Sequence, residues 1–259
     1  MIQSIDIIDK YFYHNCISFI MLGIWIYIGV KGYNLNSIKA KRKISIYIIS
    51  ICLVQELLDF TNRIFLDSDY MFSIQRDLPF LQFCQISFYF SLLCIFFTRD
   101  SVYDNQNYSL KQFIFDCSFL LGFSGAFQGI ITPDFLNINN LLGVICIQLQ
   151  HSLIILNLVW LMFAYGYKLK FKGLYLTYIF INLIAPFALL FNHLIGINSA
   201  GDAANYFYVN ELPQIDNFFL NFVSQYESPE YILYIQPVFI IYFCTLYIPF
   251  AILNKIRKK

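Results

Sequence analysis

Lysine and arginine are confined almost entirely to alternate gaps between the long apolar stretches of this chain, and this pattern constrains the fold more than any motif. Seven apolar stretches divide the 259 residues, and 14 of the 17 basic residues fall in the first, third, fifth and seventh gaps that follow them. A soluble protein has no reason to sort charge in this way. A membrane protein does, because basic residues near the ends of its spans stay on the cytoplasmic side.

Composition agrees with insertion in a membrane. Charged residues make up 13% of the chain, about half of the roughly 25% that soluble domains carry. Seven spans of about 20 residues use most of the sequence, so we expect a single transmembrane domain over residues 1–259. Only helices satisfy every backbone group within one segment, so the expected fold is all-α and no strands are predicted.

The expected spans, with ends good to a few residues, alternate in direction through the bilayer. They are Phe12–Val30, Ile44–Phe60, Leu78–Phe97, Phe113–Ile131, Leu141–Tyr165, Leu174–Ile195 and Tyr231–Leu253. The basic residues expected inside are Lys31, Lys39, Lys41, Arg42, Lys43, Arg99, Lys111, Lys168, Lys170, Lys172, Lys255, Arg257, Lys258 and Lys259. Outside are Lys10, Arg63 and Arg76. The prediction is a multi-pass protein of the cell membrane with its N-terminus out and its C-terminus in.

The longest gap, residues 196–230, has no basic residue and must lie outside under this topology. Its acidic residues are Asp202, Glu211, Asp216, Glu227 and Glu230. The net charge of +1 gives no reason to expect a nucleic-acid partner. Basic residues at span ends instead point to membrane lipids as partners, and the sequence says nothing about protein partners. The seven cysteines lie in apolar stretches without CxxC spacing, so we expect no disulfide framework, no metal and no cofactor.

Polar side chains inside spans are costly and mark candidate functional positions. They gather in the outer halves of four spans. Cys84 is six residues into its span and His151 ten residues into its own, so their depths differ by only ~6 Å. The polar residues expected to support them are Glu56, Gln82, Gln85, Gln148 and Asn192. Each position also has a plainer interpretation as a packing or hydrogen-bonding residue.

The third span shows this ambiguity most clearly. Cys84, Ser87, Ser91 and Cys94 recur at helical spacing and share one face. Small residues in such a row are typical of a packing seam between membrane helices. The alternative is that the Cys84 thiol faces an interior cavity.

Four short segments resemble a known family, in order along most of the chain. Gly122 to Asp134 resembles the GxxGAxxxxxTPD segment of the YwaF-type bacterial membrane proteins, to which animal transmembrane protein 164 is related. Leu78 to Cys84 resembles their LPLxLC segment, with one extra residue between Pro79 and Cys84. Gln150-His151 resembles their histidine-bearing span. Asn192, Asn205-Tyr206 and Pro213 resemble their N…NY…P run.

The animal relatives are described as cysteine-centred acyltransferases acting on phospholipids, so the resemblance implies Cys84 as nucleophile and His151 as base. This pairing is chemically sound, because a thiol is a weak nucleophile until a neighbouring base takes its proton. The thiol would then hold an acyl group as a thioester. Gln82, Gln85 or Gln148 would donate to the oxyanion.

Two other functions stay open. Gly122 to Gly125 reads as GxSG and His193 to Gly196 as HxxG, a pairing that resembles the rhomboid intramembrane serine proteases through Ser124 and His193. The expected HxxxN is missing from the second span, however. A non-enzymatic protein that binds or transports a lipid or small solute is the other alternative. The feature that separates these from the acyltransferase is whether Cys84 and His151 face one another or face lipid.

Overall fold

The computed structural model describes residues 5–70, 72–78, 81–99, 108–135, 138–198, 201, 203–212 and 218–256. Several residues named above lie outside these ranges. They are Pro79, Asp202, Pro213, Asp216, Arg257, Lys258 and Lys259.

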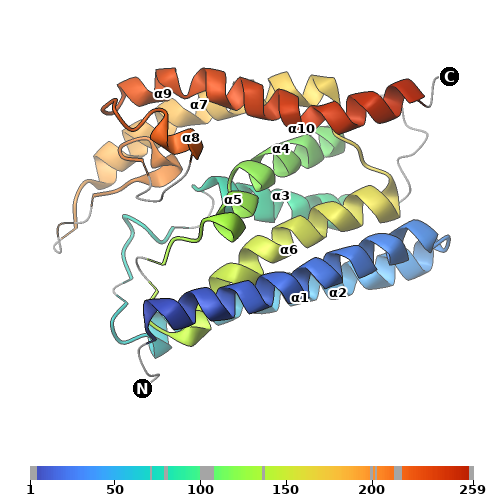
Figure 1. Ribbon diagram of the computed structural model, residues 1–259, viewed down its shortest axis with the longest axis horizontal. Helices are drawn as coiled ribbons and strands as arrows, with labels where there is room; N and C mark the ends of the chain where they lie inside the picture. The colour runs from blue at the N-terminus through green and yellow to red at the C-terminus, as the bar shows by residue number, and fades with distance from the viewer. Residues whose placement is uncertain are drawn as a thin grey trace.

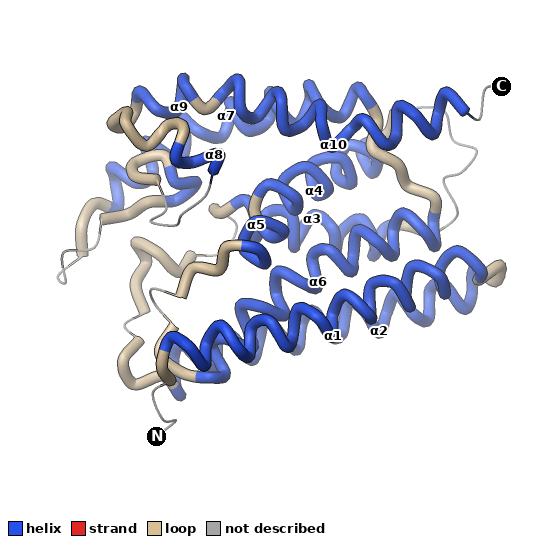
Figure 2. The backbone as a smooth tube through the Cα atoms, viewed as in Figure 1, coloured by secondary structure: helices blue, strands red, loops and turns tan. Residues whose placement is uncertain are grey.

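The described chain is a bundle of long helices running roughly alongside one another (Figures 1 and 2). The helices are α1 (Ile7–Asn34), α2 (Ile38–Thr61), η1 (Asn62–Leu66), α3 (Phe83–Phe97), α4 (Leu110–Ser124), α5 (Ala126–Ile131), α6 (Leu141–Tyr165), α7 (Phe171–Ile195), η2 (Tyr206–Tyr208), α8 (Phe218–Asn221), α9 (Glu230–Tyr234) and α10 (Gln236–Ile256). No strand is present among the described residues, and only an isolated bridge joins Ile197 to Ala203. The expected all-helical fold is confirmed.

The number of spans is confirmed only in part. Within the described residues, six helical segments are long and apolar enough to cross a membrane: residues 7–34, 38–66, 110–131, 141–165, 171–195 and 230–256. The third expected span is shorter than predicted, because α3 begins at Phe83 rather than Leu78 and has only 15 residues. At ~1.5 Å per residue it reaches roughly 22 Å, less than a hydrocarbon core of about 30 Å.

Short polar side chains fix where several helices begin. Asp6 accepts a hydrogen bond from the backbone of Asp9 at 2.9 Å, which caps α1. Asn140 accepts one from Gly143 at 2.7 Å, which caps α6. Such caps satisfy N–H groups that have no partner within the helix. At the other end of α6, Gly166 stops the helix in a left-handed conformation with φ 83°.

The α6 helix forms the centre of the bundle. It packs along α1 and also contacts α2, α3, α4 and α5. Its polar side chains are used between helices: the Asn157 amide donates to Ser91 of α3 at 2.9 Å. The Trp160 indole donates to Ser45 of α2 at 2.8 Å. These buried polar groups therefore pair across helices, as expected where water is excluded.

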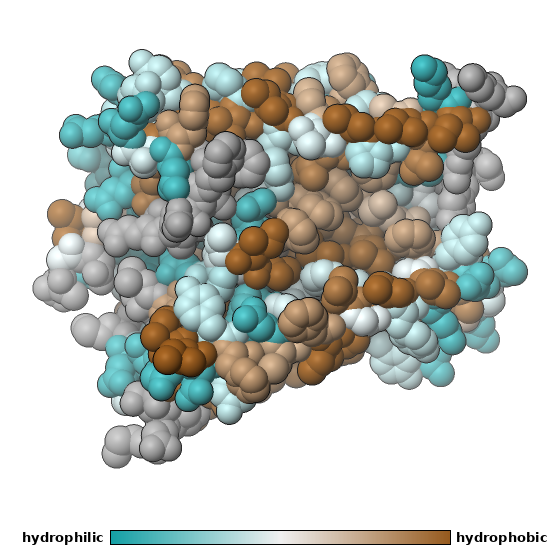
Figure 3. Space-filling view, in the orientation of Figure 1, coloured by the Kyte–Doolittle hydropathy of each residue, from teal (hydrophilic) through white to brown (hydrophobic). Residues whose placement is uncertain are grey.

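The outer surface of the bundle suits lipid contact. In Figure 3, apolar residues run along the long helices and hydrophilic residues gather towards the two ends of the molecule. Many large apolar side chains of α1, α2, α7 and α10 are exposed, including Phe19, Leu57 and Ile241. A soluble monomer rarely exposes continuous apolar surface of this extent. The distribution is what a bilayer requires.

Candidate functional site

A cavity of about 430 Å³ opens between the helices near the end of the bundle that carries the N-terminus. Its walls come from η1, α3, α5, α6, α7 and α10 and from the loop that follows α7, and most of the lining is apolar. Both Cys84 and His151 line it. Two residues separated by 67 positions in the sequence therefore face one shared space.

Cys84 lies in the first turn of α3, not six residues inside a span. The first hydrogen bond of this helix runs from Ile86 N to Gln82 O at 2.9 Å. The N–H groups of Phe83, Cys84 and Gln85 consequently have no carbonyl partner within the helix. In the described chain no side chain caps this end, and the N–H groups of Cys84 and Gln85 lie near the thiol. The thiol therefore sits at the positive end of a helix dipole, beside free donors.

Three glycines allow neighbouring helices to approach closely at the site. Gly122, Gly125 and Gly129 fall on one face at the α4–α5 junction. A methyl group added at Gly125 would lie 3.1 Å from the backbone nitrogen of Cys84. One added at Gly129, a single turn further on, would lie 2.6 Å from the His151 ring. These glycines thus bring Cys84 and His151 against adjacent turns of the same helical segment.

The small-residue face of α3 is a packing seam along most of its length, but it faces the cavity at Cys84. Ser87 donates to Ser118 O of α4 at 2.7 Å, and Ser91 accepts from Asn157 of α6. The Cys94 thiol points to Lys111 O at 3.7 Å. These three residues form a packing seam. Cys84 ends the row where α4 breaks at Gly125, and so its thiol faces the cavity.

The predicted supporting residues divide into two groups. Gln82 and Gln85 line the cavity, and their buried side-chain carbonyl oxygens have no hydrogen-bond partner among the described residues. Gln148 does not line it, because its amide turns towards α1 and donates to Ser18 at 2.6 Å. Glu56 lies behind the site and accepts hydrogen bonds from Tyr89 at 2.7 Å and Gln150 at 3.0 Å.

Asn192 contacts the loop that follows α7 and does not line the cavity. Its side chain is buried, accepts from Tyr206 N at 2.9 Å and donates to Tyr206 O at 3.1 Å. The Tyr206 hydroxyl in turn donates to Ile74 O at 2.7 Å and accepts from Leu78 N at 2.8 Å. Burial raises the pKa of Tyr206 to about 12, so the hydroxyl keeps the proton that it donates. The loop is thereby tied to the segment that leads into α3.

A histidine that the sequence did not single out lies close to the site. His14 of α1 is buried, and its Nε2 lies 3.0 Å from Ile130 O, next to Gly129. It is near enough to His151 for the charges of the two rings to interact. Its place depends on packing between α1 and α5, which no local pattern reveals.

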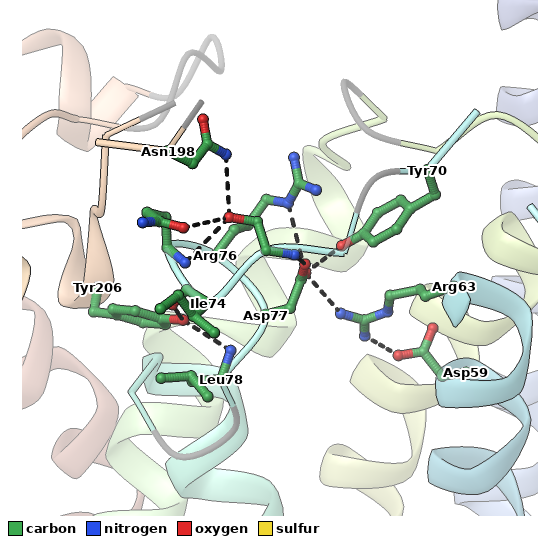
Figure 4. A network of polar contacts seen from close by, with 11 residues as sticks. Asp59, Arg63, Tyr70, Ile74, Arg76, Asp77, Leu78, Asn198 and Tyr206 are labelled. Carbon is green, nitrogen blue, oxygen red and sulfur yellow. Dashed lines mark hydrogen bonds and ion pairs between the residues drawn. The ribbon is translucent and has the colours of Figure 1, made fainter. Parts of the chain in front are cut away.

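Charged residues gather at the mouth of the cavity (Figure 4). Arg63 of η1 pairs with Asp59 one turn earlier and lies 3.5 Å from Asp77. Asp77 also lies 3.5 Å from Arg76 and accepts hydrogen bonds from the Tyr70 hydroxyl and, at 2.8 Å, from Ser73 N. Burial and the nearby Asp77 carboxylate raise the pKa of Tyr70, which stays protonated. The mouth is polar, whereas the interior is mainly apolar.

The residues of the serine-protease alternative do not meet in this cavity. Ser124 lines it, but its hydroxyl donates back to Leu120 O at 2.8 Å. His193 is exposed at the end of α7 and is not among the lining residues. In the described part of the chain, no group of three histidine, cysteine or acidic residues is arranged to hold a metal ion.

The chain matches a known protein family. The profile of the TMEM164 family matches residues 9–247, which include every residue of the site described above. No curated protein and no solved structure matches the chain.

Proposed function

The chain belongs to the TMEM164 family, and on that premise we propose that it is a lipid acyltransferase with Cys84 as nucleophile and His151 as general base. The observation that carries this proposal is that the thiol and the imidazole line one cavity. Their separate packing against Gly125 and Gly129 supports it, because the two glycines lie one helical turn apart.

The chemistry follows from the two side chains. His151 takes the proton of the Cys84 thiol, and the thiolate attacks the carbonyl carbon of a lipid ester. The ester C–O bond then breaks, the lysolipid oxygen receives the proton from His151, and the acyl group stays on sulfur as a thioester. An acceptor hydroxyl reverses these steps. It loses its proton to His151 and takes the acyl group, and the thiol is restored.

The start of α3 supports this chemistry in two ways. Its free N–H groups and the positive end of its dipole stabilise the thiolate once His151 has taken the proton. The same donors can stabilise the negative oxygen that forms when the carbonyl is attacked. A nucleophile at an uncapped helix N-terminus therefore needs fewer other polar groups, which suits a cavity that is otherwise apolar.

The shape of the cavity favours an amphiphilic substrate. An acyl chain fits among the apolar residues of α7 and α10, such as Ile181 and Phe239. A polar headgroup would remain at the mouth, beside Arg63 and Asp77. In this orientation the ester bond of a phospholipid, between head and chain, comes near Cys84.

The test is acyl exchange by the purified protein in micelles of diacylphospholipid and lysophospholipid. We expect Cys84→Ala to abolish exchange and His151→Gln to lower it about 10²- to 10⁴-fold, because a positioned base contributes about this factor. Mass spectrometry of the wild type should find an acyl group on Cys84 that hydroxylamine removes. The matched control is Cys16→Ala, which removes an exposed thiol on α1.

Retention of full exchange by a folded Cys84→Ala protein would contradict the nucleophile assignment. Absence of any acylated Cys84 in the wild type, with lipid still bound, would instead support the non-enzymatic alternative, a protein that binds lipid without reacting with it.

A further inference from the structure

Two bulky residues of the outer loop adopt a backbone conformation that side chains other than glycine rarely take. Phe207 has φ 61° and Tyr208 has φ 50°, and they follow one another. Left-handed backbone at large non-glycine residues is strained, and it persists only where surrounding contacts impose it. Such strain is concentrated at functional sites, so the contacts of this segment are of interest.

Several hydrogen bonds hold the segment in place. Phe207 N donates to Leu81 O at 2.9 Å, three residues before Cys84 in the sequence. The Tyr231 hydroxyl donates to Tyr208 O. The side chain of Asn192 forms two hydrogen bonds with the backbone of Tyr206. The strained turn is thus fixed to the entrance of α3, to α9 and to α7.

Aromatic packing also holds residues 206–208 in place, and we call these contacts and hydrogen bonds together the clamp. The Phe207 ring lies edge-on to the ring of Phe83, the residue before Cys84, with centroids 4.8 Å apart. Phe207 and Val209 are buried, whereas Tyr208 between them is 39% exposed and lines the cavity. All three residues line the cavity, but Tyr208 is the most exposed of them and the only one with a polar side-chain group.

The Tyr208 phenol is close enough to the Cys84 thiol for their charges to interact, and the same holds for Asp134 at the end of α5. Its hydroxyl has no hydrogen-bond partner among the residues that the structure describes. Nearby Tyr206 and Tyr231 both use their hydroxyls to hold backbone. Tyr208 differs from them in presenting an unused donor to the site.

We propose that Tyr208 is a catalytic residue that donates a hydrogen bond to the oxyanion formed when Cys84 attacks the acyl carbonyl. This inference rests on the proposed acyl transfer and extends it to the loop that follows α7, which also lines the cavity. The carbonyl oxygen receives negative charge as the sulfur–carbon bond forms. Tyr208 and the first-turn N–H groups of α3 then hold that oxygen between them until the ester C–O bond breaks.

Tyr208 keeps its proton throughout this cycle. Burial raises the pKa of its phenol above the usual value, so the group is a hydrogen-bond donor and not a proton source. The proton that leaves the thiol travels through His151 to the departing oxygen. The rigid backbone of the clamp explains why strain is tolerated here: a preorganised donor needs no rearrangement when charge develops.

The test uses the purified full chain and p-nitrophenyl octanoate, an ester that releases a coloured product as the thiol is acylated. Tyr208→Phe keeps the ring and removes only the donor. We expect its acylation rate to fall about 100-fold, the typical effect of losing one oxyanion donor. Alkylation of Cys84 by iodoacetamide, followed by mass spectrometry, should be unchanged, because that substitution forms no oxyanion.

Tyr234→Phe is the matched control, since its ring stacks on Tyr226 outside the cavity lining and its acylation rate should equal that of the wild type. A wild-type acylation rate in Tyr208→Phe would overturn the assignment of Tyr208. Equal slowing of acylation and alkylation would also overturn it, because a structural effect acts on both. An undiminished burst in Cys84→Ala would reject the nucleophile itself, which separates that failure from failure of Tyr208.

Discussion

At the scale of single residues, Cys84 differs from the other six cysteines by its surroundings and not by its sequence neighbours. Cys52, Cys94, Cys117 and Cys146 are buried, and Cys16 and Cys244 are exposed on the outer helices. Cys84 is half-buried at a helix start and lines the cavity. Helical spacing alone predicts that Cys84 lies on the same face as Ser87. Where α3 begins, however, depends on long-range contacts of the preceding segment, and sequence periodicity carries no information about such contacts.

The glycines next to the site give a prediction at this scale. Gly129→Ala should displace the imidazole, because the new methyl group would lie 2.6 Å from the Cε1 atom of His151. Acylation by p-nitrophenyl octanoate should slow at least tenfold while the protein stays folded. Gly23→Ala is the control, since a methyl group there meets nothing within 4 Å. Equal rates for the two variants would show that Gly129 does not position the base.

The helical spacing of these glycines can be recognised from the sequence alone. Gly122, Gly125 and Gly129 recur at three and four residues, a pattern that indicates close approach of helices. What the pattern did not contain is which side chains would fill the space. Those partners are Ser87, Cys84 and His151, and they come from two other helices.

At the scale of elements, the hydrophobic pattern predicted the long helices well and the irregular ones poorly. The bounds Leu141–Tyr165 were confirmed for α6, whose ends are set by Asn140 and Gly166. The predicted fourth span is interrupted at Gly125, and the seventh is divided between α9 and α10. Apolar composition continues through these interruptions, although Gly125 and Ile235 at the two breaks line the cavity. Composition therefore could not reveal them, although they shape the cavity.

The loop that follows α7 offers a prediction at this scale. Asn192→Ala removes both hydrogen bonds to Tyr206 and leaves buried backbone groups unpaired. The hydrogen-bonded conformation of the loop should lose roughly 1–3 kcal/mol of stability. Hydrogen exchange at the Tyr206 amide should accelerate by on the order of tenfold or more. Exchange in α6 should not change. The exposed Asn34→Ala serves as control, and unaltered exchange at Tyr206 in Asn192→Ala would contradict this role for the side chain.

At the scale of the whole molecule, the charge pattern and the arrangement of the helices both bear on how the protein is oriented in the membrane. The start of α1 and the end of α10 lie at opposite ends of the bundle (Figure 1). Lys31, Lys41 and Lys168 lie near the end of the bundle away from the cavity, at the junctions of α1, α2, α6 and α7. From the positive-inside rule we expect that end to be cytoplasmic and the cavity to lie on the outer side.

This assignment predicts the outcome of reporter fusions. A reporter inserted at Gly201, within the outer loop, should read extracytoplasmic, and one fused after Lys259 should read cytoplasmic. Because the orientation rests on basic residues, replacing Lys39, Lys41, Arg42 and Lys43 together by glutamine should produce a mixed population of orientations. Replacing Glu227 and Glu230 by glutamine should not, since acidic residues contribute little to the rule. A cytoplasmic signal from Gly201 in the wild type would reverse the topology and move the Cys84 cavity to the inner leaflet. Its lipid substrates would then come from the cytoplasmic face, although the arrangement of the thiol, the imidazole and the cavity would be the same.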